Sequence, residues 1–183
     1  MQFLNDPKLQ VTDGILFDLS KHATNYTASI ADEEQAEKLL KKANKSIYKE
    51  QRKLNAADNH SVLCIFQAMD AAGKDSTVRS VFTGVNPAGF KVTSFKAPSK
   101  EELDHDFLWR CNAAVPGRGM IGIFNRSHYE EVLVCKVHPN YVVGQNIPGI
   151  ESEADLTPEF WTDRYKSIRN WENHLAKNGT VVL

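Results

Sequence analysis

Residues 61–77 decide the fold of this chain, and they read Ser-Val-Leu-Cys-Ile-Phe-Gln-Ala-Met-Asp-Ala-Ala-Gly-Lys-Asp-Ser-Thr. The apolar run at the start has the length of a buried strand, and small residues and a Gly-Lys pair then lead into a helix-compatible stretch. That order is the layout of a phosphate-binding loop. The match has two departures, because Ala68 replaces the first glycine of the usual motif and Asp75 replaces its magnesium-binding hydroxyl.

The loop nevertheless keeps the groups that hold a polyanion. Gly73 permits close backbone approach, the following helix N-terminus offers free N–H groups, and Lys74 supplies a point charge. The alternative is an ordinary strand-turn-helix connection whose lysine is solvated. On the first interpretation the loop binds phosphates through Ala71, Ala72, Gly73, Lys74, Asp75 and Ser76.

The composition is that of a globular protein, with 183 residues, 42% of them hydrophobic and 25% charged. A net charge of -1 gives no global attraction for nucleic acid or anionic lipid, so we expect neither as a partner. No stretch approaches the roughly 20 apolar residues that a membrane helix needs. Three cysteines without a Cys-x-x-Cys pair favour buried, reduced thiols, and we expect a cytoplasmic protein.

The segment before the loop divides into two parts. Residues 1–30 are turn-rich and predict an irregular arm, whereas residues 32–57 lack Gly and Pro, begin with acidic residues and predict a long helix. Lysines recur on one face of that helix at intervals of three and four. They form either a solvated surface or a rail for an extended polyanion, and the rail would consist of Lys41, Lys45 and Lys49.

After the loop, residues 61–183 predict an α/β core. Further strands are expected at residues 90–95, 120–124 and 180–183, and helices at residues 76–82, from Ser99 to about Cys111, and from Thr157 to about residue 177. Residues 132–137 fit a helix or a short strand equally well. This alternation predicts a parallel sheet. No helix follows the last strand to cover it, so we expect an incomplete core, truncated at the C-terminus.

Polar residues follow the third expected strand at residues 125–131, where open α/β sheets place ligands. In a P-loop enzyme, this strand usually ends in an Asp that holds magnesium, and Asn125 occupies the comparable place here. Arg126, next in the chain, is either a phosphate ligand or a structural ion-pair partner. Asp70 and Asp75 are either metal ligands or caps of the helix N-terminus.

Four ordered blocks of the sequence together resemble the polyphosphate kinase 2 family. The resemblance is strongest from about residue 61 to residue 139 and continues to the end of the chain. Its form Asn-Arg-Ser-His-Tyr-Glu at residues 125–130 is similar to the branch that phosphorylates nucleoside monophosphates and diphosphates. The blocks are residues 66–75, 95–99, 105–110 and 116–130.

The resemblance implies a P-loop-kinase-like, three-layer αβα sandwich and assigns roles to several residues. By this resemblance Gly73, Lys74 and Arg126 bind phosphates, and Asp70 orients the acceptor phosphate and holds Mg²⁺. It also places Asn125, Glu130 and Glu131 in the catalytic centre, with Arg118 adding positive charge to the phosphate site. Members of the family continue beyond the strand at residues 180–183 with a helical lid, which this sequence does not contain.

The predicted activity is reversible, direct in-line phosphoryl transfer between inorganic polyphosphate and a purine nucleoside mono- or diphosphate (AMP or ADP), with Mg²⁺ as cofactor. The resemblance also implies a homo-oligomer. Two alternatives stay open on the residues alone. One is a nucleoside monophosphate kinase that uses ATP, and the other is a truncated, non-catalytic subunit that binds polyanions.

Overall fold

The computed structural model describes residues 18–23, 25–69 and 71–183. The chain divides into two units, residues 1–43 and residues 44–183, and the boundary falls within helix α1 (Glu33–Ala57). The expected helix at 32–57 is therefore present. Of the predicted irregular arm, residues 1–17 and 24 lie outside the described residues, and a short 3₁₀ helix occupies Leu19–Lys21. A single domain over residues 1–183 stays a prediction.

The start of α1 shows how its sequence fixes the N-terminus. The carboxylate of Asp32 accepts a hydrogen bond from the backbone N–H of Gln35 (2.7 Å), and the Gln35 side chain in turn accepts one from the N–H of Ala31 (2.6 Å). These two bonds satisfy N–H groups that a helix start otherwise leaves without partners. Lys38 and Glu34 then form an exposed ion pair one turn apart (2.6 Å).

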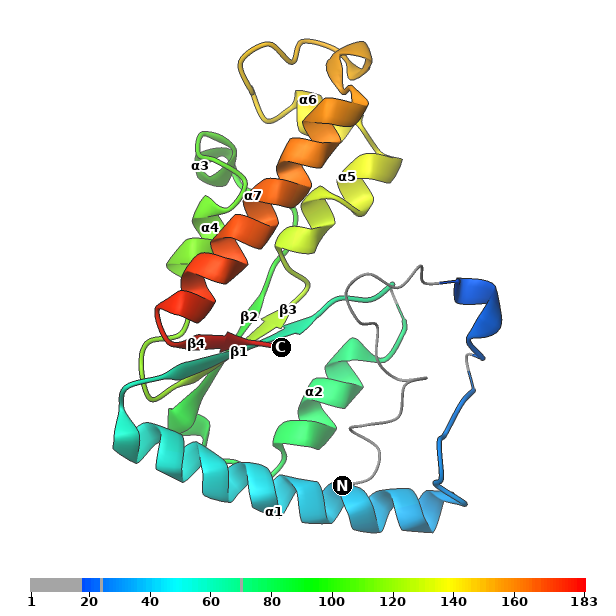
Figure 1. Cartoon of the computed structure of the whole chain (residues 1–183), viewed down its shortest axis with the longest axis vertical. Coiled ribbons are helices and arrows are strands. Elements are labelled where there is room, and N and C mark those ends of the chain that lie inside the picture. The colour runs from blue at the N-terminus through cyan, green and yellow to red at the C-terminus, as the bar shows by residue number, and fades with distance from the viewer. Residues whose placement is uncertain (1–17, 24, 70) are drawn as a thin grey trace. The chain divides into compact units, whose positions relative to one another are not determined.

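The second unit is built on a parallel sheet. Within the described residues its strands are β1 (Ser61–Phe66), β2 (Phe90–Ser94), β3 (Ile121–Asn125) and β4 (Thr180–Val182), in the order β2-β3-β1-β4. All three pairings are parallel, as the alternation of strands and helices predicts. The loop after β1 therefore lies next to the segment after β3, since Phe66 pairs with Asn125 at the ends of those strands (Figure 1).

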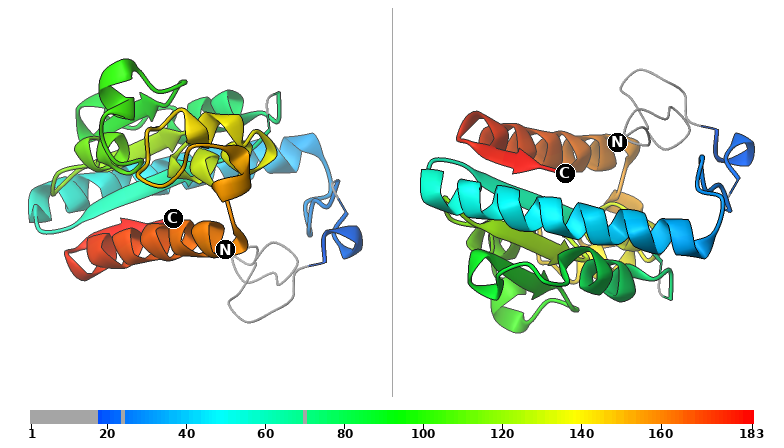
Figure 2. Two further views of the ribbon diagram at one scale, coloured as in Figure 1. Left: turned by 90° about the horizontal axis from the view of Figure 1, so that it is seen from above. Right: turned by 90° about the horizontal axis from the view of Figure 1, so that it is seen from below.

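Alternate residues of the central strands point to opposite faces of the sheet and build two cores. Leu63 and Phe124 pack with residues of α4 (Trp109–Ala113) and α7 (Pro158–Lys177). On the other face, Val62 and Ile123 pack with α2 (Lys74–Phe82) and with the part of α1 from residue 44 onward. Figure 2 shows α7 on one side of the strands and α2 on the other, so this unit is the expected three-layer αβα arrangement.

One expectation about helices needs correction. The helix expected from Ser99 to Cys111 is two short helices, α3 (Lys100–Leu103) and α4, because the Asp106 carboxylate accepts a hydrogen bond from the N–H of Leu108 (2.9 Å) in the intervening turn. The segment at 138–153 is largely loop, as expected, with one short helix, α6 (Asn140–Val143). The ambiguous residues 132–137 supply α5 (Val134–Val137).

Further 3₁₀ helices are found at Pro87–Gly89, His128–Glu131 and Glu153–Asp155. In the part of the chain that the structure describes, no helix is both long and apolar enough to cross a membrane.

Candidate active site

The loop between β1 and α2 has the backbone conformation of an anion-binding turn. Ala71 (φ +61°) and Gly73 (φ +86°) both adopt left-handed conformations, and Gly73 directly precedes the first residue of α2. Left-handed residues beside right-handed ones turn successive N–H groups toward one concave surface, where an anion can accept their hydrogen bonds. Only glycine adopts φ near +86° without steric cost, which accounts for Gly73 in the motif.

Lys74 lies over this loop. Its ammonium group donates hydrogen bonds to the carbonyl oxygens of Ala68 and Met69, both at 2.9 Å. The hydroxyl of Ser76 donates to the carbonyl of Gly73 (2.8 Å) and stabilises the turn into α2. The charge of Lys74 is thus held by backbone carbonyl groups of the loop. Asp70, predicted to be the metal ligand, lies outside the described residues.

The end of β3 contacts the loop directly. Asn125 donates a hydrogen bond from its amide to the Asp75 carboxylate (2.5 Å), and the N–H of Arg126 donates to the carbonyl of Phe66 (3.0 Å). Arg126 has a left-handed backbone (φ +62°), which turns the chain away from the strand direction. The structure therefore brings together Lys74, Asp75, Asn125 and Arg126, which come from two separate sequence blocks.

These residues border a cleft of about 690 Å³, which we call the loop cleft. Its wall carries four basic side chains and a single described carboxylate, that of Asp75. Such an excess of positive charge within one cleft attracts a polyanion even though the whole chain is nearly neutral. The basic residues are Lys74, Arg79, Lys96 and Arg126.

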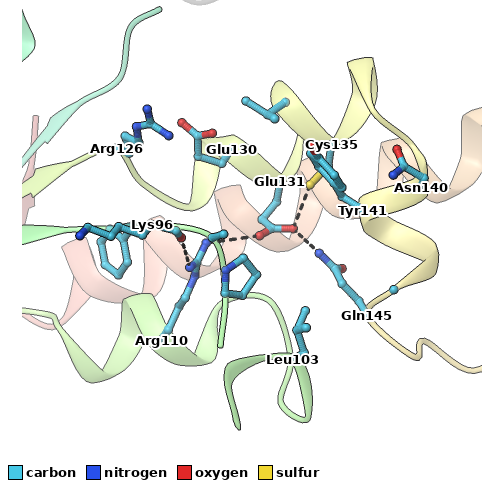
Figure 3. Close-up of a pocket in the computed structure, with 15 residues that line it drawn as sticks. Lys96, Leu103, Arg110, Arg126, Glu130, Glu131, Cys135, Asn140, Tyr141 and Gln145 are labelled. Carbon is cyan, nitrogen blue, oxygen red and sulfur yellow. Dashed lines mark hydrogen bonds and ion pairs between the residues drawn. The ribbon is translucent and has the colours of Figure 1, made fainter. Parts of the chain in front are cut away.

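A second pocket of about 480 Å³ adjoins the loop cleft. The two cavities share the wall formed by residues 95–97 and by Arg126. Figure 3 shows Arg126 and Glu130 at one end of this second pocket and Asn140 and Tyr141 at the other. Apolar and aromatic side chains with a few polar groups are typical of small-molecule sites.

The neighbouring residues Glu130 and Glu131 have different environments. Glu130 lines the second pocket and accepts a hydrogen bond from the Gln67 amide (2.6 Å). Glu131 is only 4% exposed, and its carboxylate pairs with Arg164 (2.9 Å) and accepts a hydrogen bond from Gln145 (2.7 Å). The resemblance places both in the catalytic centre, which stays a prediction, and the structure shows Glu131 held in the pocket wall by Arg164 and Gln145.

Arg164 is the centre of this buried network. Its guanidinium also donates to Gln145 and lies between the rings of Phe107 (4.6 Å) and Phe160 (5.0 Å). Burial lowers the pKa of Arg164 from its ordinary value, and the Glu131 carboxylate opposes that shift. The network joins α7 to Gln145, which follows α6, and to the segment that follows β3, and so it fixes the wall of the second pocket. Figure 3 shows the Glu131–Gln145 contact of this network.

Arg118 is the clearest correction to the predicted site. Its guanidinium donates to the carbonyl oxygens of Asn59 (2.7 Å) and Asn178 (3.3 Å), which precede β1 and β4. Arg118 itself precedes β3, so it lies at the amino-terminal end of the parallel strands, whereas the loop lies at their carboxyl end. It therefore does not contribute charge to the loop cleft, and its contacts connect the segments that enter the sheet.

The predicted rail lies on α1. Lys41, in the first unit, pairs with Glu37 (3.5 Å), and both side chains are largely exposed. Lys45 and Lys49, in the second unit, are exposed. The exposure of these lysines is compatible both with a rail for an extended polyanion and with an ordinary solvated helix surface.

Sequence reasoning missed several residues that shape the site. Gln67 holds Glu130, Lys96 lines both cavities, and Arg110 lies 3.7 Å from the Glu131 carboxylate. Gln67 carried a usable signal, because it is the first polar residue after β1, at the ligand-binding end of the sheet. Lys96 and Arg110 lie in the blocks at residues 95–99 and 105–110 that carry the resemblance, but no local pattern assigned them to the site, since their proximity depends on how the segment after β2 folds back.

A parallel sheet whose first strand leads through a left-handed loop and a lysine into a helix defines this unit as a P-loop protein of the kinase-like αβα class. The comparisons with known proteins narrow the class. The family model described as polyphosphate kinase 2 matches residues 29–183, and the chain belongs to that family.

Two curated relatives and one crystal structure show the extent of the similarity. The ADP-polyphosphate phosphotransferase of Rhodopseudomonas palustris is 45% identical, with 96% of this chain and 60% of the relative covered. The AMP/ADP-polyphosphate phosphotransferase of Meiothermus ruber is 41% identical, with coverage of 91% and 57%. The crystal structure of polyphosphate kinase 2 from Arthrobacter aurescens superposes with a TM-score of 0.80 at 34% identity, covering 95% of this chain and 57% of that one. This chain thus spans about three fifths of the length of its relatives.

Proposed function

We propose that the protein transfers a phosphoryl group between inorganic polyphosphate and a nucleoside mono- or diphosphate, AMP or ADP. The observation that carries this proposal is the pair of adjoining cavities with Arg126 in their common wall. One is a basic, phosphate-binding cleft, and the other is a more apolar pocket. Relatives named ADP-polyphosphate phosphotransferase and AMP/ADP-polyphosphate phosphotransferase support the same assignment.

In this proposal the end of the polyphosphate chain lies on the loop and the nucleotide occupies the second pocket. Phosphoryl transfer needs positioning and neutralisation of the charge on the transferred group more than covalent chemistry. Lys74 and the loop N–H groups hold the donor phosphates. Arg126 faces both cavities and is placed to contact the group in transit, which passes in line from donor to acceptor.

The residues around the loop also fit a divalent cation, which we propose to be Mg²⁺. Mg²⁺ is usually held by one or two carboxylates together with substrate phosphates and water. The Asp75 carboxylate lies at the edge of the loop cleft, and Asn125 holds its orientation. Asp70 is the second proposed ligand, on the resemblance alone. When bound, the cation would neutralise charge on the phosphates.

The decisive experiment measures phosphorylation of AMP and ADP by this 183-residue chain with polyphosphate and Mg²⁺. Lys74→Ala should lower kcat/KM by about 100-fold or more, the usual effect of removing one charge-stabilising group. Lys177→Ala, an exposed lysine at the end of α7, is the matched control and should not change it. Turnover with ATP but not with polyphosphate would support a nucleoside monophosphate kinase instead. Polyphosphate binding without turnover would support a non-catalytic subunit.

We also propose that Lys41, Lys45 and Lys49 guide long polyphosphate chains. The support is their spacing along α1 and the exposure of all three side chains. Replacing the three by Glu should weaken the binding of long polyphosphate and leave that of tripolyphosphate unchanged. Equal affinity of this variant and the wild type for long chains would contradict the rail.

The three cysteines of the chain, Cys64, Cys111 and Cys135, are free thiols. We propose a cytoplasmic protein on this basis, because reducing compartments keep cysteines unpaired. A homo-oligomer remains a prediction from the resemblance, and light scattering of the purified chain would test it.

A further inference from the structure

Gln67 makes two hydrogen bonds that connect β1 to the segment after β3. Its amide nitrogen donates to a carboxylate oxygen of Glu130 at 2.6 Å, and its amide oxygen accepts from the hydroxyl of Ser127 at 3.1 Å. Gln67 directly follows the last residue of β1, whereas Ser127 and Glu130 belong to the turn after β3. The side chain of Gln67 thus bridges the two segments that form the site.

The partners of Ser127 fix which way the amide of Gln67 points. Ser127 is fully buried, and its hydroxyl oxygen already accepts a hydrogen bond from the N–H of Tyr129 (3.2 Å). Its own proton is donated to the amide oxygen of Gln67, which leaves the amide nitrogen of Gln67 free to donate in the other direction. The amide nitrogen then faces Glu130, whose contacting oxygen accepts the hydrogen bond.

This geometry places the carboxylate of Glu130 at the wall of the second pocket in a fixed orientation. Glu130 lines the second pocket and does not line the loop cleft. Within the described residues, Gln67 is the hydrogen-bond partner that the structure gives to this carboxylate, through one of its two oxygens. The other oxygen is left to accept a hydrogen bond from a molecule in the pocket.

We propose that Gln67 is a positioning residue, which holds the side chain of Glu130 oriented so that Glu130 accepts a hydrogen bond from the nucleotide. The inference rests on the proposed function, because it takes the second pocket as the nucleotide site. It makes Gln67 a determinant of nucleotide affinity and not of polyphosphate affinity. If Gln67 only stabilised the fold, replacing it would change the affinities for nucleotide and for polyphosphate to the same extent.

The variant that tests this role is Gln67→Glu, which keeps the size of the side chain and the acceptor for Ser127 but replaces the donor facing Glu130 by a carboxylate. Two carboxylates at hydrogen-bond distance repel each other when both are ionised, and they share a proton at lower pH. At pH 8 the nucleotide KM should therefore rise by at least about tenfold, the equivalent of one charge-assisted hydrogen bond. Near pH 5.5 most of this defect should disappear, and the polyphosphate KM should not change at either pH.

A second measurement needs no turnover. The stability of Gln67→Glu, followed by urea unfolding, should fall relative to the wild type as the pH rises from 5.5 to 8. Adding Glu130→Gln should restore it, because a donor and an acceptor then face each other again in the reverse order. Asn170→Asp adds the same charge at an exposed position of α7 and should show no such pH dependence.

The outcomes separate this inference from the proposed function. Wild-type turnover together with a defect in Gln67→Glu that is independent of pH, or equal for both substrates, overturns the positioning role and leaves the function intact. A wild-type chain without turnover refutes the proposed function. In that case a pH-dependent stability loss, rescued by Glu130→Gln, still supports the Gln67–Glu130 contact, and its absence overturns it.

Discussion

Replacement of Arg164 by Met should destabilise the protein strongly without touching the loop cleft. Arg164 and Glu131 are 4% and 5% exposed at their side chains, and their atoms lie 2.9 Å apart. Removing one partner of a buried ion pair leaves the other charge without compensation and costs about 3–5 kcal/mol. The nearest remaining cation is Arg110, 3.7 Å from the other carboxylate oxygen of Glu131. Because Arg110 retains part of the compensation, we expect a loss near the lower limit, about 3 kcal/mol.

The assay is thermal and guanidinium unfolding followed by tryptophan fluorescence. For a chain of this length, a loss of about 3 kcal/mol lowers Tm by about 6–12 °C. Arg169→Met, an exposed arginine on the same helix, is the matched control and should stay within about 0.5 kcal/mol of the wild type. Replacing Arg164 and Glu131 together by Met should recover part of the loss, because no buried charge then remains unpaired. Equal stability of Arg164→Met and Arg169→Met would refute the reasoning.

Three further predictions concern the loop, a partly buried carboxylate and one buried thiol. Gly73→Ala should weaken tripolyphosphate binding, measured by calorimetry, because its φ of +86° is strained for any residue with a Cβ; unchanged affinity would contradict the loop assignment. Burial raises the pKa of Glu172, but hydrogen bonds from His128 and Tyr129 outweigh it and leave the pKa below its usual 4.5. Glu172 therefore contributes stability above pH 4.5 that is lost as the pH falls below it. In the variant Glu172→Gln, the free energy of unfolding, measured with urea, should depend less on pH in that range. Burial raises the pKa of Cys111 to about 12, so this thiol should react with Ellman's reagent at pH 8 only in the unfolded chain.

Much of the fold could be predicted because its signals are local. The apolar run that becomes β1, the glycine before α2, and the Thr157 cap with Pro158 of α7 each depend on neighbours within a few residues. The strand order β2-β3-β1-β4 depends instead on contacts far apart in the chain, and no local pattern encodes it. The broken helix after Ser99 was missed because one Asp side chain competes for a backbone N–H in the turn.

The site was predictable where a residue follows a strand and unpredictable where it precedes one. Asn125 ends β3 and Arg126 directly follows it, and the parallel sheet brings them to the loop after β1. Arg118 lies in the same sequence block as these residues, yet it precedes β3 and so lies at the far end of the sheet. A block of sequence that spans a whole strand joins opposite ends of the sheet, so membership of the block does not locate a residue in the site.

Glu130 and Glu131 show the same limit at the scale of one residue. Both are acidic, both follow β3, and the sequence offers no reason to separate them. In the 3₁₀ helix His128–Glu131, however, successive side chains point in different directions. Glu130 reaches Gln67 at the wall of the second pocket, and Glu131 reaches Arg164 in the interior. The difference in their roles therefore comes from the partner that each one meets. Neutralising Glu131 should lower the free energy of unfolding, whereas neutralising Glu130 should weaken the binding of the nucleotide.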